Sequence, residues 1–294
     1  MDYQAQLTNL AAENDFFIGF DSDGCVFDSM EIKHKECFCP AFVKHFHLQA
    51  VSKYARETWD FVNLYSKSRG CNRFLAVTTA MDLLAQRPEI AARGVELHPL
   101  SKLRAWQAVE SALGNPALIA RVNETHDPEF EMLLAWSLEV NERVADLVHG
   151  LSPFPGVREV LAGGTGRADM LVVSQTPLEA LEREWAESGI ADSIRAIAGQ
   201  EHGTKTEHLK LAASGKYAPE KILMIGDAPG DHKAAKANGA LFFPVVPGRE
   251  ESSWVRLRDE ALDRFFAGTY AGDYQASLLA EFDAALPSAP PWSR

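Results

Sequence analysis

The stretch from Phe16 to Ser29, FFIGFDSDGCVFDS, constrains the fold of this chain more than any other segment. Phe16–Phe20 is a short apolar run that predicts a buried β-strand, and Asp21 and Asp23 follow it directly. In a parallel α/β sheet, ligands bind where the strands end. Two neighbouring carboxylates repel each other, so burying them requires a cation between them or a proton on one. The alternative is an ordinary polar turn, because Asp, Ser and Gly are common turn residues.

The remainder of the chain shows two kinds of pattern. Residues 30–151 carry mainly helical signals, whereas strand and helix patterns alternate from residue 152 onward. We therefore predict an α/β protein with a Rossmann-like parallel sheet core, formed by residues 1–29 and 152–294, and an inserted all-helical cap domain, residues 30–151. Within the core, residues 247–294 are expected to form a helical tail that frays from Pro287 onward. The later strands are expected at Asp169–Ser174, Ile194–Ile197, Lys221–Asp227 and Leu241–Val246.

Composition excludes some classes of partner. The chain has 29 Lys and Arg against 41 Asp and Glu, a formal net charge of −12, whereas nucleic-acid binders present a basic face. No window approaches the roughly 20 apolar residues of a membrane span. Residues 1–15 lack the basic start and apolar stretch of a secretory signal. We expect a soluble, cytoplasmic protein with no nucleic-acid or membrane partner, and no pattern indicates its oligomeric state.

Polar side chains also follow two later predicted strands and occur in one later loop, as Asp21 and Asp23 follow the first strand. Ser174 ends the second predicted strand, Lys205 lies in a Gly-Thr-Lys-Thr loop, and Asp227 ends the clearest strand, with Asp231 close behind. These groups resemble, in order, the four motifs of the haloacid dehalogenase-like (HAD) phosphohydrolase superfamily. The first motif, Asp-x-Asp-Gly-x-x-x-Asp-Ser, resembles the branch with phosphoglycolate phosphatase, β-phosphoglucomutase and phosphonoacetaldehyde hydrolase. That family often has Lys-Pro in its third motif, and the departure here makes Lys210 the alternative to Lys205.

The resemblance implies phosphoryl transfer from a small phosphorylated substrate. Asp21 would attack phosphorus and form an aspartyl-phosphate, and Asp23 would serve as general acid and base. Ser174 and Lys205 would hold the phosphate, and Gln175 is a candidate substrate-binding residue.

A Mg²⁺ cofactor is also implied. Asp21, Asp227 and the backbone carbonyl of Asp23 offer the oxygen ligands that Mg²⁺ prefers. Asp231 would lie behind them and hold Lys205 or a metal-bound water.

These residues predict a Mg²⁺-dependent phosphatase that cleaves a small phosphate monoester. A dehalogenase is disfavoured, because a departing halide needs no acid such as Asp23. A phosphomutase or a phosphonoacetaldehyde hydrolase-like enzyme on the same core stays open, the latter requiring a cap lysine for a Schiff base. A non-catalytic regulatory protein that binds a phosphorylated ligand is the alternative of another class, although a pure binder has no need of Asp23.

One basic loop in the predicted cap is a candidate for substrate recognition. The segment Tyr65–Arg73 contains Lys67, Arg69 and Arg73, in the position where this branch carries its specificity loop. Any of the three could bind a second acidic group on the substrate. A solvated basic loop in an acidic protein is the alternative interpretation.

Overall fold

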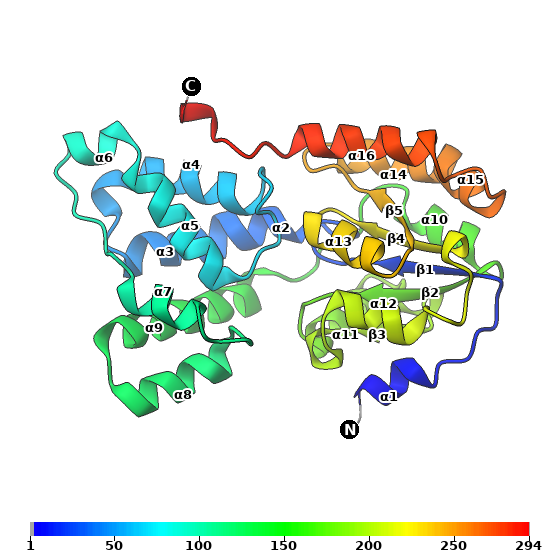
Figure 1. Cartoon of the computed structure of the whole chain (residues 1–294), viewed down its shortest axis with the longest axis horizontal. Helices are drawn as coiled ribbons and strands as arrows, with labels where there is room; N and C mark the ends of the chain where they lie inside the picture. The colour runs from blue at the N-terminus through cyan, green and yellow to red at the C-terminus, as the bar shows by residue number, and fades with distance from the viewer. Residues whose placement is uncertain (1–2, 294) are drawn as a thin grey trace. The chain divides into compact units, whose positions relative to one another are not determined.

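The computed structural model describes residues 3–293 and confirms the predicted α/β class, with a parallel sheet and a helical insertion. The strands form one parallel sheet in the order β3-β2-β1-β4-β5 (Figure 1). β1 is central, and its last residue, Phe20, lies beside Val172 of β2 and Ile225 of β4. The strands are β1 (Phe16–Phe20), β2 (Ala168–Val173), β3 (Ala196–Ala198), β4 (Ile222–Gly226) and β5 (Leu241–Pro244).

Helices cover both faces of this sheet, so β1, β2, β4 and β5 are almost wholly buried and their sequences are mainly apolar, whereas the edge strand β3 is partly exposed. Ile18 and Phe20 of β1 join one hydrophobic cluster, with α10, α11, α14 and α15, whereas Phe17 joins the other, with α1, α12 and α13. α16 contributes to both clusters, through Leu278 and Phe282. These helices are α1 (Tyr3–Thr8), α10 (Val157–Gly164), α11 (Leu178–Glu187), α12 (Lys205–Ala212), α13 (Pro229–Ala237), α14 (Glu250–Arg256), α15 (Leu262–Phe266) and α16 (Asp273–Ala285).

The segment between β1 and β2 is helical and has its own aromatic core. Trp59 and Trp136 are fully buried at its centre, with their ring centroids 6.2 Å apart. Asp127 accepts a hydrogen bond from the Glu129 amide and so caps the longest helix, which then begins with Pro128. The helices are α2 (Ser29–Ile32), α3 (Cys39–His45), α4 (Ser52–Asn63), α5 (Arg73–Ala85), α6 (Pro88–Ala92), α7 (Ser101–Gln107), α8 (Asn115–Thr125) and α9 (Pro128–Leu147).

The described chain divides into two compact units. One contains residues 3–30 and 150–286, and the other contains residues 31–149 and 287–293. The sequence analysis assigned the whole of 247–294 to the core, and this is wrong for residues 287–293, which group with the helices.

The last described residues pack on the helical unit because an aromatic side chain finds partners there. Trp292 packs edge-to-face on Phe61, with centroids 5.5 Å apart, and the Arg87 guanidinium lies 4.3 Å from the Trp292 ring centre. The carbonyl of Pro287 accepts a hydrogen bond from the Lys67 amide at 3.3 Å. The expected fraying from Pro287 is therefore also wrong for residues 287–293, and Arg294 lies outside the described residues. Within residues 3–293, no helix combines the length and the apolar character needed to cross a membrane.

Candidate active site

The carboxyl edge of the sheet brings three buried aspartates together. Asp21 follows β1, and its amide donates to the Ile225 carbonyl at 2.9 Å, which extends the pairing of β1 with β4 by one residue. This pairing places Asp21 beside Asp227, the residue after β4. Asp21, Asp227 and Asp231 each offer a carboxylate oxygen, and these oxygens lie within 4.8 Å of one another.

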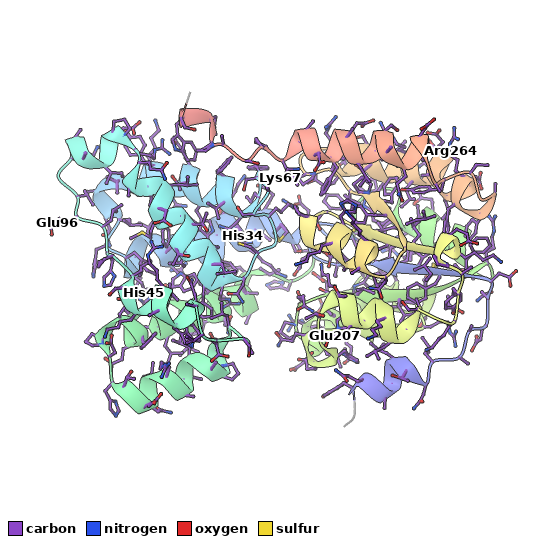
Figure 2. All side chains as sticks on the ribbon, in the orientation of Figure 1. His34, His45, Lys67, Glu96, Glu207 and Arg264 are labelled. Atoms are coloured by element: carbon purple, nitrogen blue, oxygen red, sulfur yellow. The ribbon has the colours of Figure 1, made fainter. Side chains whose placement is uncertain are left out.

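Lys205 lies between two of these carboxylates. Its Nζ is 2.7 Å from Asp21 Oδ2 and 2.5 Å from Asp231 Oδ1. Lys205 is the first residue of α12, and reciprocal capping between Thr204 and Glu207 fixes the start of that helix. Glu207 is labelled in Figure 2. Lys210, the alternative from the sequence, is exposed on the same helix. Lys205 is therefore the lysine that meets the aspartates.

Gly226 allows the third aspartate to approach this closely. A Cβ on Gly226 would lie 2.5 Å from the Asp231 side chain, so any larger residue would displace it. Asp231 sits in the first turn of α13, where its Oδ2 accepts the Ala228 amide at 3.0 Å. The Gly-Asp pair at the end of β4 thus places Asp227 and leaves room for Asp231.

The charges at this edge are unbalanced. Burial raises the pKa of the Asp21 carboxyl well above its usual value; Lys205 opposes this rise, and Asp231 and Asp227 add to it. Burial lowers the pKa of Lys205, but the carboxylates of Asp21 and Asp231 outweigh burial, and the net shift is upward. A divalent cation would offset the excess negative charge and favour the ionised form of Asp21. The buried set of carboxylate oxygens therefore fits Mg²⁺ chemically.

The side chain of Asp23 lies outside this acidic cluster. Its Oδ2 accepts the Thr176 hydroxyl at 2.6 Å, and its Oδ1 accepts the hydroxyl of Ser29. The predicted metal contact of Asp23 is through its backbone carbonyl and stays a prediction. The structure thus separates the two aspartates of the first motif into different hydrogen-bond environments.

Ser174 and Gln175 lie at the same edge, after β2. Ser174 is buried, its amide donates to the Ala198 carbonyl at 2.9 Å, and its hydroxyl accepts the Thr176 amide at 3.2 Å. The Gln175 side chain donates to the Gly203 carbonyl at 2.8 Å, in the loop before Lys205. Gln175 therefore joins two loops of the site.

Three polar contacts at the site were not predicted from sequence. The Ser22 hydroxyl donates to Glu184 and accepts the indole N–H of Trp185, each at 3.1 Å, so α11 holds the residue between the two aspartates. The Thr176 hydroxyl binds Asp23, and α11 begins two residues later, at Leu178. A Thr-Pro pair is also typical of the start of a helix, so the sequence carried no signal for the contact with Asp23.

The basic residues of the candidate specificity loop differ in their surroundings within the helical unit. Lys67 has an exposed side chain (Figure 2). Arg69 is buried and donates to the Leu64 carbonyl at 2.9 Å.

Arg73 joins two helices of that unit. Its guanidinium bonds Ser137 Oγ and Asn141 Oδ1 of α9, at 3.0 and 2.8 Å, and lies 5.1 Å from the ring centre of Phe38. Burial lowers the pKa of Arg73 to about 10. These contacts link α5 to α9, a packing role that the sequence analysis did not predict.

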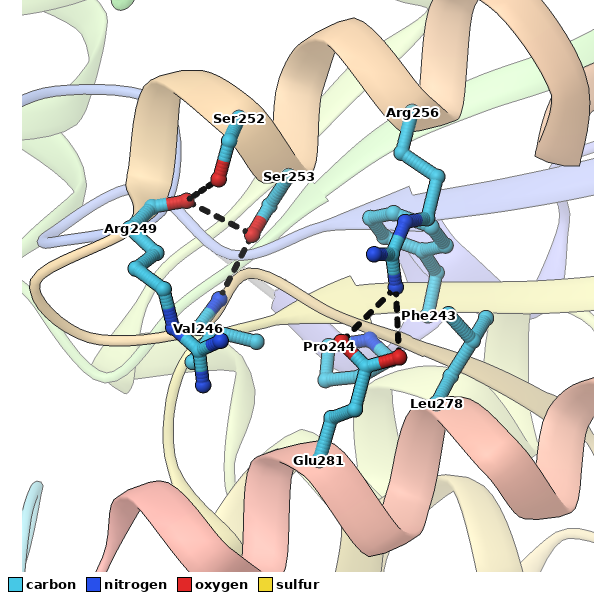
Figure 3. A pocket seen from close by; sticks show the side chains of 9 residues that line it. All are labelled: Phe243, Pro244, Val246, Arg249, Ser252, Ser253, Arg256, Leu278 and Glu281. Carbon is cyan, nitrogen blue, oxygen red and sulfur yellow. Dashed lines mark hydrogen bonds and ion pairs between the residues drawn. The ribbon is translucent and has the colours of Figure 1, made fainter.

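A cavity elsewhere in the sheet unit is too small for a substrate. Figure 3 shows it between α14 and α16, where Arg256 pairs with Glu281 at 2.9 Å. Its volume is about 30 Å³, enough for about one water molecule. It carries no chemistry comparable to that of the aspartates.

Comparisons with known proteins agree with this architecture. The family model described as haloacid dehalogenase-like hydrolase matches residues 109–245, which include Ser174, Lys205 and Asp227 but begin after Asp21. No curated protein matches the chain in sequence.

Several solved structures resemble the chain. A haloacid dehalogenase-like family hydrolase from Streptococcus pneumoniae is 13% identical, covers 91% of this chain and 98% of its own, and has a TM-score of 0.50. β-Phosphoglucomutase from Clostridium difficile is 13% identical, covers 86% and 97%, and has a TM-score of 0.51. A protein described as a predicted phosphoglycolate phosphatase from Haemophilus somnus is 17% identical, covers 79% and 86%, and has a TM-score of 0.45. At these identities, the first two structures, with TM-scores of 0.50 and 0.51, show the fold. The resemblance to the haloacid dehalogenase-like hydrolases that the motifs predicted is therefore confirmed, by the family model in sequence over residues 109–245 and by these two structures in fold.

Proposed function

We propose that this protein is a Mg²⁺-dependent phosphatase that hydrolyses a small phosphate monoester through an aspartyl-phosphate on Asp21. The observation that supports this best is the contact of buried Asp21 with Lys205 beside Asp227 and Asp231. Burial with incomplete compensation of charge is typical of a reactive carboxyl group, and the cation beside Asp21 could also bind an anionic phosphate.

The reaction can be written in two steps with these residues. An oxygen of Asp21 attacks phosphorus, the ester P–O bond breaks, and the leaving oxygen takes a proton from Asp23. Asp23, now ionised, accepts a proton from water as that water attacks phosphorus. The bond from phosphorus to Asp21 then breaks, which releases inorganic phosphate and restores the carboxylate.

The other residues at the edge would bind and orient the phosphate. The Lys205 ammonium would balance phosphate charge, and the Ser174 hydroxyl would hold a phosphate oxygen. Asp21 and Asp227 would hold Mg²⁺, and Asp231 would keep Lys205 in place. When bound, Mg²⁺ supplies positive charge that stabilises the transferring phosphoryl group. We retain Lys67 as a candidate ligand for a second acidic group on the substrate. Arg69 and Arg73 are weaker candidates, because Arg69 is buried against the Leu64 carbonyl and α9 engages Arg73.

The experiment is hydrolysis of p-nitrophenyl phosphate and a panel of sugar and acid phosphates, with Mg²⁺ or EDTA. We expect turnover that requires Mg²⁺ and falls by about 10³-fold or more in Asp21→Asn, because the nucleophile is lost. Asp192→Asn, an exposed aspartate in the same unit, is the matched control and should keep wild-type turnover.

Equal turnover in Asp21→Asn and wild type would exclude this mechanism. A folded wild-type protein without activity on any ester would instead favour the alternatives of phosphomutase, phosphonate hydrolase or non-catalytic phosphate-ligand binder. Those alternatives separate by isomerisation of a sugar phosphate, by cleavage of phosphonoacetaldehyde, or by ligand binding without product.

A further inference from the structure

The contact between Thr176 and Asp23 connects two neighbouring strand ends. Asp23 is the third residue after β1, and Thr176 is the third residue after β2. The Thr176 hydroxyl donates to Asp23 Oδ2 at 2.6 Å, while the Ser29 hydroxyl donates to Oδ1. Each oxygen of the Asp23 carboxyl therefore has a hydroxyl donor.

The backbone of Thr176 is itself fixed on both sides. Its amide donates to Ser174 Oγ at 3.2 Å, and its carbonyl accepts the Gln200 amide at 3.0 Å. A Cβ on Gly199 would lie 2.9 Å from the Thr176 carbonyl oxygen and 2.8 Å from the Leu178 nitrogen. The loop after β3 thus packs directly against this backbone and holds in place the residue that carries the hydroxyl.

Two donors on opposite oxygens have a chemical consequence. A carboxyl group held at both oxygens cannot rotate freely about its Cβ–Cγ bond. Each oxygen can accept more than one hydrogen bond, so the positions that remain for substrate or water have fixed directions. Proton transfer depends strongly on such alignment between donor and acceptor.

We propose that Thr176 is a positioning residue that orients the carboxyl group of Asp23 for proton transfer to the leaving oxygen. This inference rests on the proposed phosphatase function and adds a residue outside the four motifs. Thr176 acts only through Asp23 and forms no covalent bond in the reaction.

Substrates with different leaving groups provide the test. Phenyl phosphate and p-nitrophenyl phosphate have similar shapes, but phenolate is the more basic leaving group and depends more on an acid. In Thr176→Val we expect kcat/KM for phenyl phosphate to fall by about 10- to 100-fold, the effect of losing a hydrogen bond to an ionisable group. For p-nitrophenyl phosphate we expect a loss below about 3-fold. Thr176→Ser, which keeps the hydroxyl, should restore most of the loss.

Two controls separate positioning from general damage. Thr165→Val removes a hydroxyl that donates only to the Leu161 carbonyl in the same unit, and it should leave both rates unchanged. Thermal unfolding checks that Thr176→Val is folded; if it is not, Thr176→Ala takes its place.

The outcomes are distinct. A larger loss on phenyl phosphate, with rescue by serine, supports the inference. If Thr176→Val lowers kcat/KM equally for both esters, or for neither, the inference is overturned. The proposed function still holds in that case, because the wild type is active. If the wild type hydrolyses neither ester, the proposed function fails and this inference fails with it.

Discussion

Asp21 and Asp169 are both buried aspartates on neighbouring strands of one sheet, but they lie near opposite ends of those strands. Asp21 follows the carboxyl end of β1, whereas Asp169 is the second residue of β2, level with Phe17. Asp169 accepts four hydrogen bonds, from the backbone amides of Glu13 and Asn14, from the side-chain amide of Asn14 and from the hydroxyl of Tyr217, and it pairs with Arg195 at 2.8 Å.

Burial tends to raise the pKa of both carboxyl groups, but their net pKa shifts are opposite. Burial tends to raise the pKa of Asp169, but the bonds from Tyr217 and Asn14 and from the backbone outweigh it and lower this pKa to about 2. Burial raises the pKa of Asp21, Asp231 and Asp227 add to the rise, and Lys205 does not outweigh it. Burial alone therefore does not mark a functional aspartate. The marker is burial with incomplete compensation, which is typical of reactive groups.

Among the changes that test this difference, Asp169→Asn should have the largest effect on stability. The substitution removes the charge that Arg195 and four hydrogen bonds stabilise, and we expect a loss of about 3 kcal/mol in the free energy of unfolding. Turnover per folded molecule should not change, since Asp169 lies near the other end of β2 from the candidate active site. Urea unfolding measures this loss, and Asp21→Asn should show the reverse pattern, with stability kept and turnover lost. A stable Asp169→Asn variant would contradict our account of this network.

The pH dependence of stability should show directly how much Asp169 contributes in its ionised form. Because the pKa of Asp169 is lower in the folded protein than the usual 3.8, its stabilisation is complete above pH 4 and is lost as the pH falls toward 2. The difference corresponds to about 2 kcal/mol. Unfolding curves of wild type and Asp169→Asn should therefore converge by about this amount between pH 4 and 2, and parallel curves would show that Asp169 does not titrate this way.

Tyr217→Phe is the smallest of these changes. It removes one neutral donor from Asp169 and keeps the ring that packs on Phe17. We expect a loss of about 1.5 kcal/mol in the free energy of unfolding, smaller than that of Asp169→Asn. The double variant should lose little more than Asp169→Asn alone, whereas full additivity would mean that the hydroxyl stabilises the protein in another way.

The sequence predicted the parts of the site that follow from sheet geometry. Apolar runs before Asp21, Ser174 and Asp227 predicted buried strands, and parallel strands bring their carboxyl ends to one edge. The third strand was less clear, and β3 is displaced to Ala196–Ala198 from the expected Ile194–Ile197. The juxtaposition of Asp21 and Asp227 followed from this geometry. Lys205, the first residue of α12, was instead expected from the motif resemblance, and the catalytic roles of these residues stay predictions.

Long-range pairs of single side chains could not be predicted in the same way. Thr176 with Asp23 and Trp185 with Ser22 join distant positions and leave no periodic pattern. The final segment was misassigned for a related reason. The prolines and small polar residues around Trp292 are typical of a frayed chain end. Nothing in the local sequence indicates that the Trp292 indole packs on Phe61 and Arg87.

The placement of residues 287–293 has a consequence for engineering. Between residues 3 and 293 the chain passes from one unit to the other after Met30, after His149 and again after Leu286. Residues 31–149 therefore do not make up the whole helical unit, because residues 287–293 also belong to it. A chimaera that exchanges only residues 31–149 for a foreign helical insert would leave Trp292 without Phe61 and Arg87, so a working exchange must carry the C-terminal segment with it.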